Sequence, residues 1–281
     1  MDDRTLRSDI SRSPRLNDLE GREWVKSTRS WFVLTPPART KEELSHPAKF
    51  PEELASRFVR FFTRSQDWVL DPFVGIGSTL VACDQLGRNG VGVELSPEFA
   101  QSAKERLTHA KTQQYVLIGD SMRLVDLIDA YFSDSRPRFS YVFTSPPYFD
   151  MLRKSRGGND SVLKERAAKG MKQYYGESSL DLGNIESYEE YIESVALVIE
   201  QAALLLRDRS YLTLIVQNML DTDGTLRPIA WDLARRLSKT LQLKQEQVWC
   251  QDNKRLGCWG YPTTYVSNVH HHYCLVFRRG V

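Results

Sequence analysis

The segment "WVLDPFVGIGSTLVAC" (68–83) places a glycine loop between an apolar stretch and a helical pattern. Residues 68–72 are β-prone and end at a proline, which predicts a short buried strand. Gly75 and Gly77 allow a sharp turn and a close approach to a ligand, whereas an ordinary tight turn is the simpler alternative. The third glycine of a dinucleotide fingerprint is replaced by Leu80, which argues against NAD and leaves room for another adenosine ligand.

The rest of the chain alternates between strand and helix patterns. Further strands are predicted at 90–95, 115–120, 140–144, 210–216, 243–249 and 271–277. Helices are predicted from Pro51, after the glycine loop to about residue 87, from Pro97, from Ser187 and near 227–240. This alternation is typical of right-handed βαβ units, so we expect an α/β domain with a mostly parallel sheet covered by helices on both faces.

Polar motifs follow four of these strands, at the sheet edge where such folds bind ligands. Glu94 ends the second strand, where a carboxylate can accept hydrogen bonds from both hydroxyls of a ribose. Asp120 ends the third strand and can accept from an adenine amino group. Each acid also has a simpler interpretation. Glu94 can be a solvated acid, and Asp120 can cap a helix over 121–130.

The fourth motif, Ser145-Pro146-Pro147-Tyr148, comes directly after the strand at 140–144. Proline fixes its own φ and donates no hydrogen bond, so the strand ends in a rigid elbow. The hydroxyl of Ser145 and the carbonyl of Pro146 are two acceptors held in place, and Tyr148 adds an aromatic face. A rigid loop without further function is the alternative.

Together these motifs resemble the S-adenosylmethionine-dependent amino-methyltransferases of nucleic acids, which modify N4 of cytosine or N6 of adenine. The resemblance runs from His46 to Arg279. "HPAKFPEEL" (46–54) is similar to the family's segment at the methionine end of the cofactor. "VLDPFVGIGSTLVAC", "GRNGVGVELSPEFAQSAKERL", "TSPPY" and "HHHYCLVFRR" are similar to its glycine loop, ribose-binding strand, catalytic motif and final strand. In many members the catalytic half precedes the cofactor half. Ser78-Thr79 replaces the usual two threonines, and no long target-recognition domain is visible.

The resemblance implies a Rossmann-like class I methyltransferase fold, with a mostly parallel seven-stranded sheet and an antiparallel last strand. It implies an N-terminal arm over 1–45 and one catalytic domain over 46–281, in which 149–186 is an inserted DNA-recognition segment. The expected catalytic residues are Ser145, Pro146, Pro147 and Tyr148. The expected cofactor-binding residues are His46, Pro47, Phe50, Asp71, Pro72, Phe73, Gly75, Gly77, Ser78, Thr79, Glu94, Leu95, Asp120, Ser121 and Thr144.

Ser145 bears on the substrate, because SPPY is similar to N4-cytosine enzymes and DPPY to N6-adenine enzymes. We therefore expect site-specific transfer of a methyl group from S-adenosylmethionine to N4 of a flipped-out cytosine in double-stranded DNA, in a restriction–modification system or a solitary relative. The open alternatives are an N6-adenine enzyme, an RNA base methyltransferase and a base-binding protein without activity. No Pro-Cys pair of the C5-cytosine type is present.

A cluster of basic residues follows the elbow and is expected to contact DNA phosphates and bases. Its members are Arg153, Lys154, Arg156, Lys164, Arg166, Lys169 and Lys172. A solvated surface loop is the alternative. Little chain is left for reading a sequence, so we expect a short target or a homodimer that shares the task. The loop 253–265 lines the path of the DNA or is simply packed. "HHH" at 270–272 suggests zinc, but its spacing fits a strand entering near the site better, and no metal is expected.

Bulk composition fits this interpretation. The chain has 281 residues, 41% hydrophobic and 26% charged, with a net charge of +2, so a polyanion must be held by local patches. The N-terminus is charged and has no apolar stretch, so we expect no secretory signal, and no apolar run is long enough to span a membrane. The four cysteines are scattered, as expected for free thiols in a reducing cytoplasm.

Overall fold

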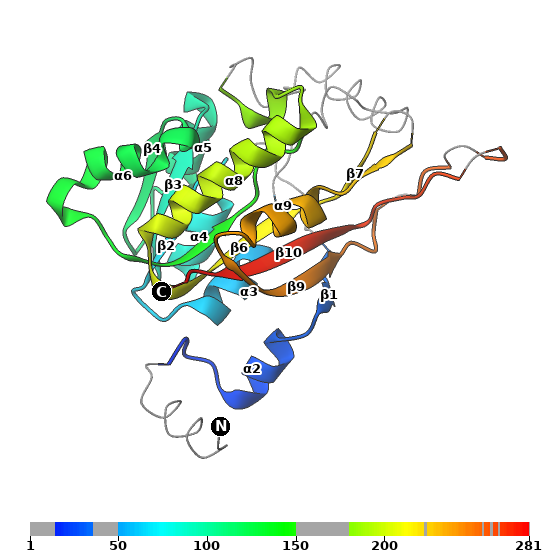
Figure 1. Cartoon of the computed structure of the whole chain (residues 1–281). Coiled ribbons are helices and arrows are strands. Elements are labelled where there is room, and N and C mark those ends of the chain that lie inside the picture. Colours follow the sequence, from blue (N-terminus) through cyan, green and yellow to red (C-terminus); the bar gives the residue numbers. More distant parts are fainter. Residues whose placement is uncertain are drawn as a thin grey trace.

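The computed structural model of the chain describes residues 15–35, 50–149, 180–221, 224–254, 256–258, 261–263 and 265–280. Their centre is an eight-stranded sheet in the order β1-β9-β10-β6-β5-β2-β3-β4 (Figure 1). The strands are β1 (Trp31–Val33), β2 (Trp68–Asp71), β3 (Asn89–Glu94), β4 (Gln114–Ile118), β5 (Phe139–Thr144), β6 (Leu206–Val216), β9 (Gln242–Cys250) and β10 (His271–Arg278). Neighbours pair in parallel except β10, which is antiparallel to β6 and β9.

Helices cover both faces of the sheet, each through its own apolar cluster. One face carries α3 (Glu52–Phe62), α4 (Ser78–Gln85) and α5 (Pro97–Arg106), and the other carries α6 (Leu124–Phe132), α8 (Tyr188–Leu205) and α9 (Ile229–Leu237). Side chains on β5 alternate between the two clusters, since Tyr141 and Phe143 pack with α3 whereas Val142 packs with α8. In Figure 1, α8 and α9 lie in front of the sheet. Among the described helices, none combines the length and the apolar composition that a membrane span requires.

Local capping signals account for several helix starts. The hydroxyl of Ser96 accepts from the amide of Phe99, and that of Ser187 accepts from the amide of Glu190. Each bond satisfies one of the amides that a helix start leaves unpaired. The side chain of Asp120 caps a short 3-10 helix, Ser121–Arg123, that leads into α6, so the capping interpretation of this acid is confirmed.

The predicted α/β class, the mostly parallel sheet and its antiparallel last strand are confirmed. The sheet has eight strands instead of seven because β1, from the segment expected to form an arm, pairs in parallel with β9. A separate two-stranded sheet, β7 (Met219–Leu220) and β8 (Leu226–Arg227), was not predicted either. The added strands have only two or three residues each, which leaves little signal in a sequence.

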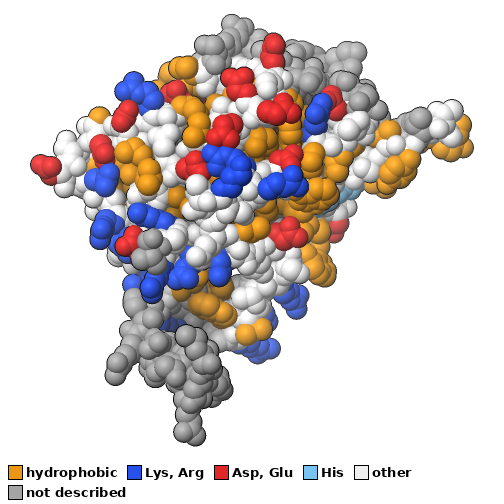
Figure 2. All heavy atoms as spheres, viewed as in Figure 1, with side chains coloured by type: hydrophobic (Ala, Val, Ile, Leu, Met, Phe, Trp, Pro, Cys, Tyr) orange, Lys and Arg blue, Asp and Glu red, His pale blue; other side chains and the backbone are white. Residues whose placement is uncertain are grey.

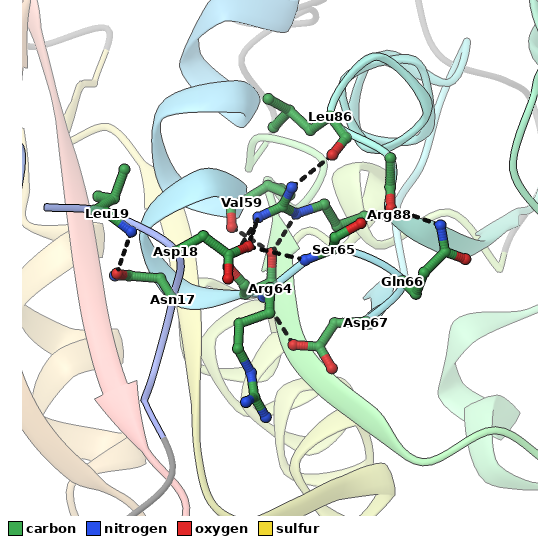
Figure 3. Close-up of polar contacts among 12 residues, drawn as sticks. Asn17, Asp18, Leu19, Val59, Arg64, Ser65, Gln66, Asp67, Leu86 and Arg88 are labelled. Carbon is green, nitrogen blue, oxygen red and sulfur yellow. Dashed lines mark hydrogen bonds and ion pairs between the residues drawn. The ribbon is translucent and has the colours of Figure 1, made fainter.

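The N-terminal segment that leads to α2 (Gly21–Ser27) and β1 is fastened to the domain by a buried arginine (Figure 3). Nε and Nη2 of Arg88 donate to the hydroxyl and carbonyl of Thr63, and Nη1 donates to the carbonyl of Leu86. Its Nη2 lies 3.4 Å from Oδ2 of Asp18, which also accepts from the amide of Ser65. Asp18 thus joins the start of the described chain to the end of α3.

Candidate active site

The carboxyl ends of β2, β3 and β5 meet at one edge of the sheet and carry predicted site residues. Asp71 is paired with Gly92, and Val142 is paired with Leu70. The glycine loop follows β2, Glu94 ends β3, and the proline elbow follows β5. The sheet therefore brings the predicted cofactor and catalytic residues together, as expected for the ligand-binding edge of a parallel sheet.

The glycine loop adopts a backbone that favours glycine. Gly75 has φ of 54° and Gly77 has φ of 87°, both in the left-handed region. A third glycine, Gly92 on β3, is needed for packing, because a Cβ at this position would lie 2.5 Å from Cγ2 of Val74. The loop thus sits directly on the neighbouring strand, close to the end of β3.

Glu94 holds this loop through backbone amides. Its Oε2 accepts from the amide of Gly75 at 2.9 Å, and its Oε1 accepts from the amide of Ser96 at 2.8 Å. Each carboxylate oxygen has a further lone pair. Burial raises the pKa of Glu94 to about 7, against the two amide hydrogen bonds, and the charges of Asp181 and Asp71 add to the rise. This chemistry fits a group with paired hydroxyls, because an ionised carboxylate accepts strongly from both.

Asp71 has a different role from the one expected of it. Its side chain is fully buried, and its Oδ1 accepts from the amide of Phe73 and from the hydroxyl of Thr144 at 2.6 Å. Its Oδ2 accepts from the hydroxyl of Thr79 at 2.5 Å. The carboxylate therefore joins the glycine loop, the start of α4 and the residue before Ser145. Because its oxygens are inside the protein, Asp71 positions the site and does not present an acceptor to a ligand.

The burial of Asp71 has a measurable effect on stability. Burial raises its pKa to about 6, although hydrogen bonds from Thr144, Thr79 and Phe73 oppose the rise. A raised pKa means that the protonated form is favoured by folding, so this stabilisation is present at pH 4 and is lost as the pH rises through 6. Asp71→Asn cannot ionise. The unfolding free energy of Asp71→Asn, taken relative to that of the wild type, should therefore rise by up to about 3 kcal/mol between pH 4 and pH 8. This value follows from ~1.4 kcal/mol for each unit by which the pKa is raised.

Urea unfolding of both proteins across this pH range measures the difference. The pKa of Glu94 is raised mainly by burial and only to a smaller extent by the charge of Asp71, so most of its contribution is common to both proteins. A difference between Asp71→Asn and the wild type that does not change with pH would contradict the assignment.

The elbow after β5 is held by a hydrogen bond within it and by contacts from two other parts of the chain. The side chains of Ser145 and Tyr148 are hydrogen-bonded to each other. Burial raises the pKa of Tyr148 to about 12, against that bond, so the phenol stays protonated near neutral pH. From α8, the hydroxyl of Tyr191 donates to the carbonyl of Pro147 at 2.9 Å. A Cβ on Gly183 would lie 3.3 Å from the carbonyl of Tyr148, so this glycine also packs on the elbow.

Several predicted residues take structural positions around this centre. The ring of Phe50 packs edge-on against Phe143, 5.4 Å between centroids. The hydroxyl of Ser121 donates to the carbonyl of Pro72, and that of Ser78 approaches Glu52 at 3.5 Å. Phe73 and Leu95 are half-buried at the same edge. His46 and Pro47 lie outside the described residues, as do Arg153, Lys154, Arg156, Lys164, Arg166, Lys169 and Lys172.

Three residues of the site were not predicted from the sequence. Tyr191 reaches the elbow from α8, although its spacing predicted only a core position. Asp181 is 7% exposed, caps the turn that carries Gly183, and adds to the raised pKa of Glu94. His272 lies beside Tyr148, with 6.3 Å between ring centroids. Each depends on a contact between distant parts of the chain. The only sequence signal was for His272, in a strand expected to enter near the site.

Two further expectations concern the cysteines and metals. All four cysteines are free, and Cys83 and Cys274 are buried. Within the described ranges, no three His, Cys, Asp or Glu side chains lie together as metal ligands would.

Comparison with known proteins identifies relatives of the cofactor half of the chain. Residues 10–105 match the family model N6_N4_Mtase, described as DNA methylase. Type II methyltransferase M.SmaI of Serratia marcescens is 48% identical over 63 residues, which cover 22% of each chain. Type II methyltransferase M.HpaI of Haemophilus parainfluenzae is 40% identical over 67 residues, 24% of this chain and 21% of the relative. The matches to these curated relatives thus span about a quarter of their length or less.

A solved structure supports the fold over a longer range. A protein from Listeria monocytogenes, described as a class I S-adenosylmethionine-dependent methyltransferase, superimposes with a TM-score of 0.50 at 12% identity, over 87% of this chain and 63% of that one. The family match ends in α5, before the elbow at Ser145, whose role therefore rests on geometry and on the resemblance of its motif. Taken together, the comparisons show that residues 10–105, which include the glycine loop and Glu94, are similar to the DNA methylases of the N6_N4_Mtase family and to curated Type II methyltransferases.

Proposed function

We propose that this protein is a site-specific DNA methyltransferase that transfers a methyl group to N4 of cytosine. The observation that carries this proposal is the elbow Ser145–Tyr148, with a serine hydroxyl at its first position, joined through Thr144 and Asp71 to the glycine loop. The curated relatives are named Type II methyltransferases, which supports a place in a restriction–modification system. With DNA as the substrate, we assign the enzyme to the cytoplasm.

The elbow addresses the chemical difficulty of the substrate. The amine of cytosine is a poor nucleophile because its lone pair is delocalised into the ring. The hydroxyl of Ser145 and the carbonyl of Pro146 accept its two hydrogens, which favours a pyramidal nitrogen with a directed lone pair. Because the two prolines and the bond from Tyr191 fix these acceptors, little reorganisation is needed when the reaction occurs. The neutral ring of Tyr148 offers a stacking face to an extruded base.

The glycine loop and Glu94 are proposed to hold the cofactor. When bound, S-adenosylmethionine supplies an electrophilic methyl group on sulfur. Glu94 accepts from the ribose hydroxyls with the lone pairs that the amides of Gly75 and Ser96 leave free. The amine held by the elbow would receive the methyl group from that sulfur and would then lose one proton to water. Alignment of the two reactants by the two halves of the site is the main source of rate.

The connection between β9 and β10 is proposed as part of the DNA surface. It extends away from the sheet, and apolar side chains lie on its projecting end (Figures 1 and 2). Leu256, Tyr261 and Tyr265 are at least 78% exposed, so these residues do not form the packed loop that was one alternative for 253–265. Exposed tyrosines suit contacts with unstacked bases or sugars. The basic cluster over 153–172 is proposed as the phosphate-binding partner of this loop.

The second candidate is transfer to N6 of adenine by the same site. The family model includes both reactions, and the geometry of the elbow suits either amine. The serine in place of an aspartate at residue 145 favours cytosine.

The proposal is tested by nucleoside mass spectrometry of DNA from cells that express the protein, in a host without cytosine-N4 or adenine-N6 methylation. We expect N4-methyldeoxycytidine, absent from cells with the empty vector. N6-methyldeoxyadenosine alone would overturn the base assignment. DNA without either base, from cells in which the folded protein accumulates, would overturn the proposed function.

A further inference from the structure

A buried histidine with an unused hydrogen-bonding atom lies beside the catalytic elbow. His272, the second residue of β10, is 7% exposed, and its ring stacks on Trp249 with 4.6 Å between centroids and 25° between planes. The ring of Tyr148 lies 6.3 Å away. Nδ1 of His272 is buried and has no hydrogen-bond partner in the described part of the chain. Such an atom is unusual, because buried polar groups are nearly always paired.

The imidazole is fixed in place and uncharged. Trp249, which supports it, donates from its indole nitrogen to the carbonyl of Leu34 at 2.9 Å, so the stack is anchored to the segment after β1. Burial lowers the pKa of His272 to about 3, and the charges of Lys254 and His271 lower it further. A neutral imidazole carries one proton, and with that proton on Nδ1 it donates one hydrogen bond.

The sheet places the start of β10, with His272, beside the elbow. Thr144 pairs with Leu214, and Leu214 pairs with Leu275, so the end of β5 is level with the fifth residue of β10. Because β10 runs antiparallel, its first residues continue past the end of β5, where the elbow lies. In the sheet order, β10 and the glycine-loop strands β2 and β3 lie on opposite sides of β5. The ring of His272 therefore lies on the side of β5 away from the glycine loop, next to the ring of Tyr148 on which the base is proposed to stack.

We propose that His272 binds the target base, donating from Nδ1 to the ring acceptor next to the amine, which is N3 in cytosine. This assignment rests on the proposed function and adds a third polar contact to it. Ser145 and Pro146 hold the amine, whereas His272 fixes the rotation of the ring in its plane. A misrotated base directs its lone pair away from the methyl group, and small errors of this kind are costly to rate.

The test is a matched pair of variants, His272→Asn and His272→Leu. Both remove the stack on Trp249 to the same extent, and their side chains have nearly the same shape, but only asparagine keeps a donor close to the position of Nδ1. We expect kcat/KM for unmethylated bacteriophage DNA to be about tenfold lower in the leucine variant than in the asparagine variant. Calorimetric Kd values for S-adenosylmethionine should agree between the two variants, and both variants should be folded at the assay temperature.

The outcomes separate the two claims. If the wild type methylates this DNA and the two variants have equal kcat/KM, the role of His272 is overturned while the proposed function stands. If cofactor affinity differs between them as much as kcat/KM does, His272 acts on the cofactor half and the inference is again wrong. A folded wild type that binds S-adenosylmethionine but transfers no methyl group to any DNA would overturn the proposed function itself.

Discussion

Ser145→Ala is expected to lower the rate of methyl transfer to DNA about 100-fold, the effect of removing one preorganised polar group from an active site. The substitution removes one of the two acceptors proposed for the amine. It also removes the hydrogen-bond partner of Tyr148, whose ring the base would stack on. Because the rigid backbone of the elbow remains, cofactor binding should be unchanged. Single-turnover transfer of a labelled methyl group to DNA, with enzyme in excess, measures the chemical step directly.

Ser140→Ala is the matched control. Ser140 lies on β5, the strand that precedes the elbow. It is 9% exposed, and its hydroxyl is buried without a hydrogen-bond partner among the described residues. The same chemical change there should leave the rate of transfer within about twofold, because no group depends on that hydroxyl. Equal rates in Ser145→Ala and Ser140→Ala would remove Ser145 from the mechanism.

Glu94→Gln is expected to weaken S-adenosylmethionine binding by about 10- to 100-fold at pH 8, since charge-assisted hydrogen bonds are roughly twice as strong as neutral ones. The amide has one acceptor atom instead of two, so its NH₂ group must face a backbone amide, either that of Gly75 or that of Ser96. Both the ribose contact and the glycine loop are then disturbed. Isothermal titration calorimetry gives the Kd values.

The pH dependence of this effect has a definite sign. The pKa of Glu94 is raised to about 7, mainly by burial, so the acceptor form of the carboxylate is lost as the pH falls through 7. Below pH 7, wild-type affinity should fall about tenfold per unit, whereas that of Glu94→Gln stays flat. Ionisation of the cofactor is common to both proteins. Glu105→Gln, an exposed acid on α5, is the matched control, and a wild-type Kd that does not vary with pH would rule out this role for Glu94.

The sequence predicted elements that depend on local patterns. The buried strands β2 and β5 are β-prone runs ended by proline or by a hydroxyl residue. Ser96 caps α5 after β3, and Ser187 caps α8 after β5. The convergence of Glu94, Asp120 and the elbow followed from parallel topology alone. A few local rules thus predicted the edge on which the site is built.

The remaining features depend on pairs of residues that are far apart in the chain. Asp71 and Thr144 are separated by 73 positions, and Tyr191 and Pro147 by 44. Their individual positions carry no signal of the partner, so Asp71 was expected to contact the cofactor and instead is fully enclosed. β1 was missed for a similar reason, since Trp31 and Val33 are exposed and only the pairing with β9 makes them a strand.

The bond between Asp71 and Thr144 has a consequence for the order in which the two segments can occur along the chain. The glycine loop and the elbow are connected through the adjacent strands β2 and β5 and the buried carboxylate of Asp71. The polypeptide between the two strands takes no part in this contact. A circular permutation, which cuts the chain between the two strands and joins the original N- and C-termini, leaves the contact intact, provided that both strands still pair in the sheet. A circularly permuted form of this chain, with the elbow before the glycine loop, should therefore keep the hydrogen bond between Thr144 and Asp71.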